Sequence, residues 1–474
     1  MNKINIASIW EKPQVCIAGA GVAGAALGAF LARNGIRVTI IEKDWNEQQR
    51  IVGELLQPGG VAQLVAMGLD DSLNDIDAQP IYGYSIFSNK KNITIKYPKK
   101  ENNETAIGRG FHNGKFLQNL RHTLIATPHV VCERGDVVSL LEENNVVKGL
   151  LYKKSENGEA IKVTADITIV ADGIFSTLRN ELTLAQKEVT GFFIGFIMKN
   201  VALPTPNYGH VFMGGTTPVL AYPISNNEVR ILADYPYSHA PRKGDALKKY
   251  LYDLVGKQLP ENMMTAFKEV VEAGKMKFMP NHRLSAMPNK KRGAVLLGDA
   301  LNMRHPLTGG GMTVALTDVH LLGKEILLAY EKFYTAKEKL PAALEKAVNN
   351  FYEKRADYDA SINILANALY DVFKHEDLKE ACVNYLQKGG NYSQGPVSLL
   401  SGLNRDSNVL MGHFFAVALY GAKNTLTPFP TPGNIKAAYR MIKDAVNIVS
   451  PLVKSEKPNT AINSGIQLVE KIML

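Results

Sequence analysis

The sequence predicts an α/β protein, α+β overall, in which a Rossmann-like nucleotide-binding domain is joined to a β-sheet domain and a helical C-terminal region. Three features support this fold class. They are a glycine-rich turn between a strand and a helix near the N-terminus, a middle stretch rich in β-branched and aromatic residues, and amphipathic segments from about residue 342 onward. The 474 residues, 46% hydrophobic and 21% charged, are enough for large, well-buried cores.

The N-terminal third begins in the order strand, turn, helix, strand. Gln14 to Ala18 has the apolar run of a buried strand, residues 22–34 have the small side chains of a closely packed helix, and Arg37 to Ile41 has the pattern of a second strand. This order is typical of the start of a doubly wound sheet.

The turn after the first strand has the G-x-G-x-x-G pattern. Gly19 permits a tight turn, Gly21 lets the backbone approach a pyrophosphate, and Gly24 allows the helix to pack closely on the strand. Glu42, eighteen residues after Gly24, can accept hydrogen bonds from a ribose. Together these residues predict a dinucleotide site. The unit alone does not separate NAD from FAD, and a glycine turn without a nucleotide is the alternative.

The rest of the chain predicts a discontinuous nucleotide-binding domain. Residues 146–152 and 166–171 have strand patterns, and residues 191–236 indicate an antiparallel sheet that covers the substrate. The segment Ala294 to Ala300 (AVLLGDA) then returns to the buried parallel pattern, and a long helix is expected from about Gly311.

Composition excludes several classes of protein. The formal charge of +9 comes from scattered lysines rather than a basic block with aromatics, which indicates a solvated surface and no nucleic-acid partner. The three cysteines form no C-x-x-C pair, so neither a disulfide framework nor a metal site is expected.

No apolar run approaches the roughly 20 residues that a membrane-spanning helix needs. The nearest is Val409 to Tyr420, with shorter apolar stretches at Asn447 to Val453 and Ile466 to Leu474. Attachment to a membrane surface is therefore more plausible than spanning, and ordinary packing helices are the alternative.

Two further motifs favour FAD. Residues 169–173 end a predicted strand with Asp-Gly at Asp172, and residues 296–300 end another with Gly-Asp at Asp299. With the N-terminal glycine pattern, these motifs resemble those of the group A flavoprotein monooxygenases. The resemblance implies that Asp299 approaches the ribityl chain of FAD and that the glycine run 309–311 faces the isoalloxazine. Taken alone, Asp299 could instead cap a helix or a turn.

Longer blocks give a narrower match. Residues 50–60, 108–114, 302–315 and 412–418 resemble the signature blocks of the squalene monooxygenases, also called squalene epoxidases, and the resemblance extends from about residue 14 to about residue 420. It implies an enzyme of sterol biosynthesis that takes electrons from NADPH through NADPH-cytochrome P450 reductase and reduces O2 at FAD. Through a flavin C4a-hydroperoxide it would convert squalene to (S)-2,3-oxidosqualene.

A hydrocarbon substrate has nothing to deprotonate, so such a site needs an apolar channel rather than a general base. A group A monooxygenase or reductase that acts on another isoprenoid lipid is the nearest enzymatic alternative. A flavin-binding or lipid-binding protein without turnover is an alternative from a different class.

The resemblance also assigns residues. At position 43 the family more often carries Arg, and Lys keeps the charge without the planar fork. Tyr84 matches a tyrosine near the flavin that influences activity by orienting a neighbouring group, although a core tyrosine is an equal alternative. Lining the substrate channel are Tyr222, Pro396, Leu399 and His413, the last of which could be merely structural. The residues placed at FAD are Gly19, Gly21, Val22, Ala23, Gly24, Glu42, Lys43, Arg50, Leu55, Arg121, Val137, Asp172, Asp299, Gly311 and Met312.

The same resemblance divides the chain. The FAD-binding domain is expected in segments 13–80, 106–185 and 286–345, and the substrate-binding domain in segments 81–105 and 186–285. The helical region 346–474 is expected to attach the protein to the cytosolic face of the endoplasmic reticulum membrane. Basic residues available to anionic lipid are Lys423, Lys436, Arg440, Lys443, Lys454 and Lys457.

Overall fold

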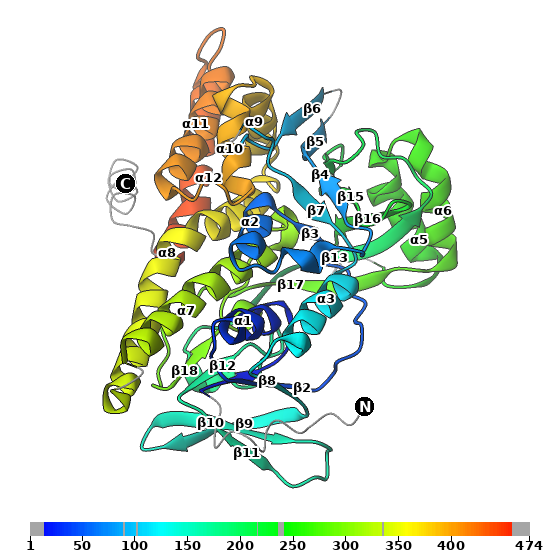
Figure 1. Ribbon diagram of the computed structural model, residues 1–474. Helices are drawn as coiled ribbons and strands as arrows, with labels where there is room; N and C mark the ends of the chain where they lie inside the picture. Colours follow the sequence, from blue (N-terminus) through cyan, green and yellow to red (C-terminus); the bar gives the residue numbers. More distant parts are fainter. Residues whose placement is uncertain are drawn as a thin grey trace.

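A parallel sheet lies in the lower half of the view in Figure 1. The computed structural model describes residues 14–88, 91–100, 103–215, 217–235, 241–333 and 336–456. All neighbouring strands of this sheet run parallel. Four of its strands are apolar and almost fully buried, as expected for a sheet covered on both faces, and the edge strand at residues 130–134 is half-buried. In spatial order they are β18 (Ala294–Leu296), β12 (Ile167–Val170), β1 (Val15–Ala18), β2 (Val38–Glu42) and β8 (Val130–Arg134).

Helices cover one face of this sheet and a small sheet covers the other (Figure 1). The helices are α1 (Val22–Arg33), α3 (Asn113–Ala126) and α7 (Gly311–Phe333), and α1 packs against both of the others. The opposite, antiparallel sheet contains β9 (Asp136–Glu143), β10 (Val146–Lys153) and β11 (Ile161–Thr164). The predicted strand–turn–helix–strand order and the long helix from Gly311 are confirmed.

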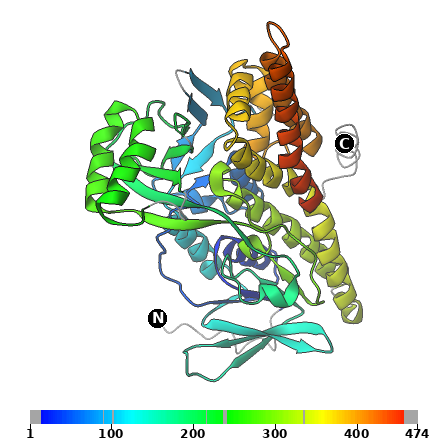
Figure 2. The same cartoon turned by 180° about the vertical axis from the view of Figure 1, so that it is seen from behind.

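A second, seven-stranded sheet stands above the first (Figures 1 and 2). Its order is β17 (Lys277–Arg283), β13 (Glu188–Lys199), β16 (Glu228–Asp234), β15 (Val219–Pro223), β14 (Gly209–Phe212), β5 (Gly83–Ser88) and β6 (Lys91–Lys96). The predicted antiparallel pairing within residues 191–236 is confirmed, and β14 also pairs in parallel with β5, a strand outside that stretch. The chain between them forms β8 and β12 of the parallel sheet, and such a long connection permits parallel pairing.

Each face of the seven-stranded sheet has its own apolar core. One face packs against α5 (Gly244–Leu254) and α6 (Met264–Ala273), with Ala221 among the inward residues. The other face turns toward the C-terminal helices and carries Leu220 and Tyr222, because alternate residues of a strand point to opposite sides.

Shorter elements connect the two sheets. A three-stranded sheet joins β3 (Leu55–Leu56), β7 (Gly108–Gly110) and β4 (Gln79–Ile81), and the short helices are α2 (Pro58–Ala66) and α4 (Arg179–Leu182).

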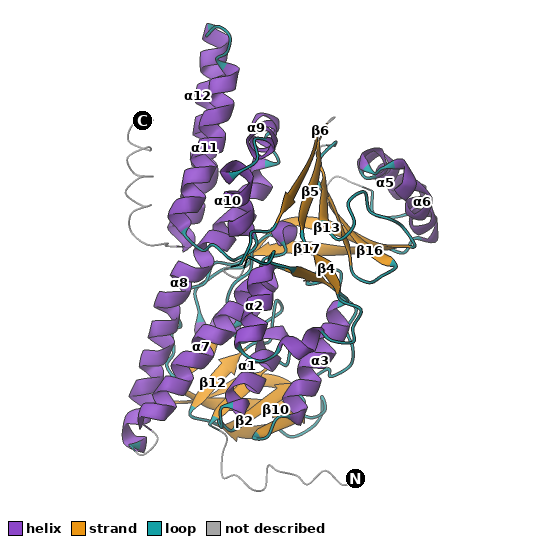
Figure 3. Ribbon diagram, turned by 45° about the horizontal axis from the view of Figure 1, so that its top comes forward, coloured by secondary structure: helices purple, strands orange, loops and turns teal. Residues whose placement is uncertain are grey.

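The C-terminal part of the described chain is helical, as predicted. Its elements are α8 (Leu340–Val372), α9 (Glu376–Gln387), α10 (Asn391–Leu400), α11 (Ser407–Thr425) and α12 (Pro432–Glu456), and α11 and α12 form a long hairpin (Figure 3). Within the described residues, no helix has the length and apolar character needed to cross a membrane. The apolar stretch Ile466 to Leu474 and Lys457 lie outside the described residues.

One buried carboxylate at the contact between the second sheet and α8 predicts a pH-dependent stability. The Tyr370 hydroxyl donates to Asp234 Oδ1 at 3.2 Å, and burial raises the pKa of Asp234 from 3.8 to about 6. A carboxyl with a raised pKa in the folded state binds its proton more tightly there than in the unfolded chain. Its stabilising contribution is therefore present at about pH 4 and is lost as the pH rises through about 6.

We expect Asp234→Asn to stabilise the protein at pH 7.5 by about 1–3 kcal/mol, and this gain should shrink as the pH falls toward 4. Urea unfolding at several pH values measures the difference. Asp357→Asn, an exposed site on α8, is the matched control. A gain that stays constant across this pH range would contradict the assignment.

Candidate functional site

The predicted glycine turn joins β1 to α1, and its backbone packs so closely that there is no room for a side chain at Gly19 or Gly24. Gly19 has φ +95°, and a Cβ on Gly24 would lie 2.0 Å from the Gly19 carbonyl oxygen. Gly21, the N-cap of α1, is different, because a Cβ there would meet nothing within 4 Å. No side chain caps α1, so the N–H groups around Val22 and Ala23 face this open space as phosphate-binding helix termini do.

Glu42, at the end of β2, holds the turn from one side. Its Oε2 accepts a hydrogen bond from the Ala20 N–H at 2.8 Å, and its Oε1 accepts one from the Asp44 N–H at 2.9 Å. Arg121 of α3 donates from Nε to the Ala20 carbonyl at 2.9 Å and lies 3.6 Å from Glu42. A carboxylate has about four acceptor positions, so Glu42 retains capacity for ribose hydroxyls.

Three other predicted FAD residues lie around Glu42. Val137 is half-buried in β9, two residues after Gly135, whose N–H donates to the Glu42 carbonyl at 3.1 Å. Lys43 and Arg50 are exposed, and Arg50 donates from Nη2 to Gln48 Oε1 at 3.0 Å.

The two Asp-containing loops lie next to each other beyond the ends of β12 and β18. Asp172 borders Gly19, and Gly298, which precedes Asp299, borders Ala23. Buried Arg179 ties the loops together by donating from Nη2 to the carbonyls of Gly173 and Asp299 at 2.9 and 3.0 Å. Sequence reasoning missed Arg179, although its place seven residues after Asp172, in a short helix, was a signal.

Several buried polar atoms near the glycine run and the Asp-Gly loop have no hydrogen-bond partner within the described residues. Among those in the described residues are Asp172 Oδ1, Arg304 Nε, Thr308 Oγ1 and Thr313 Oγ1. Burial also raises the pKa of Asp172. Buried polar groups usually have partners, so orphans beside the Asp-Gly loop and along the glycine run fit a large polar group such as FAD between them.

Tyr84 is linked to the glycine run through Gln57. The Tyr84 hydroxyl accepts a hydrogen bond from Gln57 Nε2, which also donates to the Thr308 carbonyl at 2.7 Å. The Tyr97 hydroxyl donates to Gln57 Oε1 at 2.6 Å. Burial raises the pKa of Tyr84 to about 12, so its hydroxyl is neutral at physiological pH. Gln57, which sequence reasoning did not single out, is thus the neighbouring side chain that the Tyr84 hydroxyl contacts.

Two other predicted cofactor residues flank the same region. A Cβ on Gly309 would lie 3.3 Å from Leu55 Cδ2, and one on Gly53 would lie 3.9 Å from Met312 Sδ. Leu55 and Met312 are both buried, and Gly311 opens α7.

The predicted channel residues lie in the core between the seven-stranded sheet and the C-terminal helices. Tyr222 and Leu399 are buried in the same apolar cluster as Tyr84, and Pro396 is half-buried in α10. His413 makes a 2.9 Å hydrogen bond through Nδ1 with the Tyr385 hydroxyl, and its ring packs against Gly395. This contact favours the structural interpretation of His413.

His305, beside the glycine run, is also structural. It is fully buried, it stacks on Tyr370 with ring centroids 3.7 Å apart, and its Nδ1 accepts the Leu307 N–H at 3.3 Å. Burial lowers the pKa of His305 to about 3, so it stays neutral. These contacts argue against an acid–base role.

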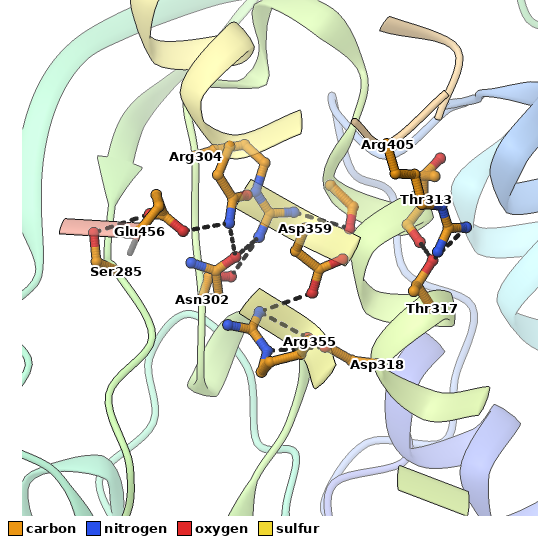
Figure 4. Close-up of polar contacts among 12 residues, drawn as sticks. Ser285, Asn302, Arg304, Thr313, Thr317, Asp318, Arg355, Asp359, Arg405 and Glu456 are labelled. Carbon is orange, nitrogen blue, oxygen red and sulfur yellow. Dashed lines mark hydrogen bonds and ion pairs between the residues drawn. The ribbon is translucent and has the colours of Figure 1, made fainter. Parts of the chain in front are cut away.

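A polar row on the buried face of α8 was missed by sequence reasoning. Asn367 accepts the His305 N–H at 3.2 Å, and Arg355 donates to Asp318 of α7 at 2.9 Å (Figure 4). Polar residues at every fourth position among apolar ones were the available signal. The row consists of Arg355, Asp359, Asn363 and Asn367, none more than 5% exposed.

Solved structures define the class of the fold. The chain matches the flavin-dependent brominase Bmp2 with a TM-score of 0.68 at 16% identity, over 87% of this chain and 100% of that chain. It matches PqsL of Pseudomonas aeruginosa, a probable FAD-dependent monooxygenase, with a TM-score of 0.62 at 17% identity, over 77% of this chain and 97% of that chain. The fold is that of the flavin-dependent monooxygenases.

Sequence relatives define the family. A squalene epoxidase family model matches residues 164–439, and an NAD(P)-binding Rossmann-like model matches residues 17–46. Squalene epoxidase 1 of Arabidopsis thaliana is 44% identical over 93% of this chain and 83% of the relative. Squalene monooxygenase of Mus musculus is 38% identical over 94% of this chain and 78% of the relative. The chain belongs to the squalene epoxidase family, which confirms the predicted family, activity and FAD cofactor.

Alanine at two glycines should separate cofactor contact from chain packing. Gly21→Ala should leave the unfolding free energy of the apoprotein within about 1 kcal/mol of the parent. It should weaken FAD binding by about tenfold or more, because its Cβ would occupy the space proposed for the pyrophosphate.

Gly24→Ala should lower both the unfolding free energy of the apoprotein and its affinity for FAD, because the new Cβ would lie 2.0 Å from the Gly19 carbonyl oxygen. Urea unfolding of the apoprotein and flavin absorbance after gel filtration measure the two effects. Equal destabilisation by both substitutions would contradict the distinction.

Proposed function

We propose that this squalene epoxidase takes its two electrons from NADPH through a separate NADPH-cytochrome P450 reductase and releases (S)-2,3-oxidosqualene while it rests on the cytosolic face of the endoplasmic reticulum membrane. Squalene, O2, two electrons and two protons balance to the epoxide and water. The observation that carries the assignment of the site is the link from Tyr84 through Gln57 to Thr308, which joins an apolar core to the glycine run. The segments of the FAD-binding and substrate-binding domains keep their predicted boundaries in this proposal.

The cofactor would extend along the orphaned polar atoms. The N-terminus of α1 would receive the pyrophosphate, Glu42 the ribose, and Asp299 the ribityl chain. The glycine run at the start of α7 would face the isoalloxazine. When bound, FAD supplies the reduction of O2 and the transfer of one oxygen atom.

The protein itself would position the substrate and exclude water from the site. Tyr84, Tyr222 and Leu399 belong to one buried cluster that offers a hydrocarbon chain apolar surroundings. The Gln57 amide, held on three sides, cannot turn without losing bonds to Tyr84, Tyr97 or Thr308. This fixed polar group at the edge of an apolar site would set how closely the alkene approaches the flavin.

Tyr84→Phe tests the role of the hydroxyl. The substitution removes one acceptor from Gln57, and we expect kcat to fall about tenfold while FAD content is unchanged. Tyr208→Phe, at another buried tyrosine of the substrate-side sheet region, is the control. Turnover and flavin content are measured on the same preparations. Equal turnover in the parent and Tyr84→Phe would return Tyr84 to the role of a core residue.

The electron donor is tested by product analysis. Purified protein is incubated with FAD, NADPH and squalene, with and without the reductase, and products are identified by mass spectrometry. We expect 2,3-oxidosqualene only when the reductase is present. Equal product with NADPH alone would refute the role of the reductase. Oxygenation only of a different isoprenoid, or flavin binding without any product, would refute squalene turnover by this chain.

Membrane attachment is assigned to the turn of the α11–α12 hairpin. Exposed apolar side chains gather there, including Phe429, 77% exposed, and Ile435, 54% exposed. Exposed Lys423 and Lys436 flank them and could meet anionic lipid headgroups. An apolar tip with a basic border favours surface attachment over ordinary packing.

We expect the double variant Phe429→Asp/Ile435→Asp to lower binding to anionic liposomes by about tenfold or more, because it replaces apolar contact with negative charge. Phe175→Asp is the matched control, since Phe175 is also 77% exposed but lies near the Asp-Gly loop. Co-sedimentation measures binding. Point variants are preferable to truncation before Asn424, because α12 packs on α8. An equal loss in the control would refute a specific role for the hairpin.

A further inference from the structure

The last turn of α12 reaches the polar region behind the glycine run (Figure 4). Glu456, the final residue of α12, accepts a hydrogen bond at Oε2 from Asn363 Nδ2 at 2.8 Å. Its Oε1 accepts another from the Ser285 hydroxyl at 3.1 Å. Ser285 follows β17 and Asn363 lies on α8, so this carboxylate joins three elements that are distant in the sequence.

The hydrogen bonds continue from Asn363 to the start of α7. Asn363 Nδ2 also donates to Asn302 Oδ1 at 3.0 Å, and the same oxygen accepts from Arg304 Nη2 at 2.5 Å. Arg304 Nη1 then donates to the Gly311 carbonyl at 3.2 Å. A continuous path of hydrogen bonds thus links Glu456 to Gly311.

The charge of Glu456 also links it to Arg304. Arg304 is 7% exposed, and burial lowers its pKa, while Asp299, Asp359 and Glu456 oppose that shift. A buried guanidinium is costly unless carboxylates or hydrogen-bond acceptors surround it. Glu456 is therefore one of the anions that allow Arg304 to remain charged beside the glycine run.

We propose that Glu456 and Asn363 are positioning residues for the segment Asn302–Gly311, so that the C-terminal helix α12 completes a cofactor site to which it contributes no predicted FAD contact. This inference rests on the proposed function, which places the isoalloxazine at that segment. Loss of the Glu456 carboxylate would free Asn363, weaken the hold on Asn302 and Arg304, and shift the backbone that faces the flavin.

The test uses the full-length holoenzyme and three substitutions at one site. Glu456→Ala removes both acceptors, Glu456→Gln keeps an acceptor without the charge, and Glu456→Asp keeps the charge but shortens the reach. Asp444→Ala, on the same helix and half-buried, is the matched control. The readouts are the dissociation constant of FAD, the visible circular dichroism of the bound flavin, kcat, and the melting temperature of the apoprotein.

We expect Glu456→Ala to raise the dissociation constant of FAD about tenfold, to change the flavin circular dichroism and to lower kcat, with the KM for squalene unchanged. Glu456→Gln should recover most of the flavin signal, and Asp444→Ala should behave as the parent. If Glu456→Ala does not fold, Glu456→Asp tests the inference instead. We expect it to raise the dissociation constant of FAD and to lower kcat by less than Glu456→Ala would.

Parent-like FAD affinity and flavin signal in the Glu456 variants would overturn the inference, even if the apoprotein melts earlier. Asp299→Ala separates this result from a failure of the proposed function. If Asp299→Ala loses FAD while the Glu456 variants keep it, the cofactor is placed correctly and only the inference fails. If Asp299→Ala also keeps FAD, the placement of the cofactor is wrong.

Discussion

The structure depends on the burial of residues 302–310, a segment that crosses the interior between β18 and α7 with one short 3₁₀ helix at Pro306–Thr308. Backbone N–H and C=O groups taken away from water need partners, and a segment with so little regular structure supplies few of them itself. Here other elements do so, each from a different part of the chain. The pairs are Leu284 with Met303 at 2.9 Å, Asn367 with His305 at 3.2 Å, and Gln57 with Thr308 at 2.7 Å.

This requirement explains why an enzyme for a hydrocarbon has so polar an interior. The cluster around the segment contains three arginines, each of which faces carboxylates (Figure 4). The arginines are Arg304, Arg355 and Arg405, and the carboxylates are Asp299, Asp318, Asp359 and Glu456. Arg355 meets both Asp318 and Asp359, and burial with repulsion between the two carboxyls raises the pKa of Asp359. The apolar cluster with Tyr84 and Tyr222 lies on the side of the segment that faces the seven-stranded sheet, and Leu307 of the segment belongs to it. Polar groups thus stabilise the backbone on one side of the segment while an apolar core packs against the other.

The sequence predicted features whose interacting residues are close together in the chain, and it did not predict contacts between residues that are far apart in the chain. The turn at Gly19 was predictable because strand, turn, helix and Glu42 are close together in the chain. The partners of Arg179, Gln57 and Asn363 were not predictable, because each side chain acts on a residue more than 60 positions away in the sequence. The parallel pairing of β14 with β5 escaped prediction for the same reason, since only the folded chain brings those strands together.

Because the proposed FAD site is built from segments that are far apart in the sequence, bound FAD would stabilise several elements at once. A ligand that binds only the native state stabilises it by about 2.7 kcal/mol at 100 times its dissociation constant. In the proposed arrangement FAD contacts the turn at Gly21, the loop at Asp299 and the start of α7, and the hydrogen bonds from Gly311 reach α12. Separation of any one of these elements would release the cofactor. The binding energy would therefore oppose local opening of the C-terminal helices as well as global unfolding, which would couple the α11–α12 hairpin to the proposed flavin site.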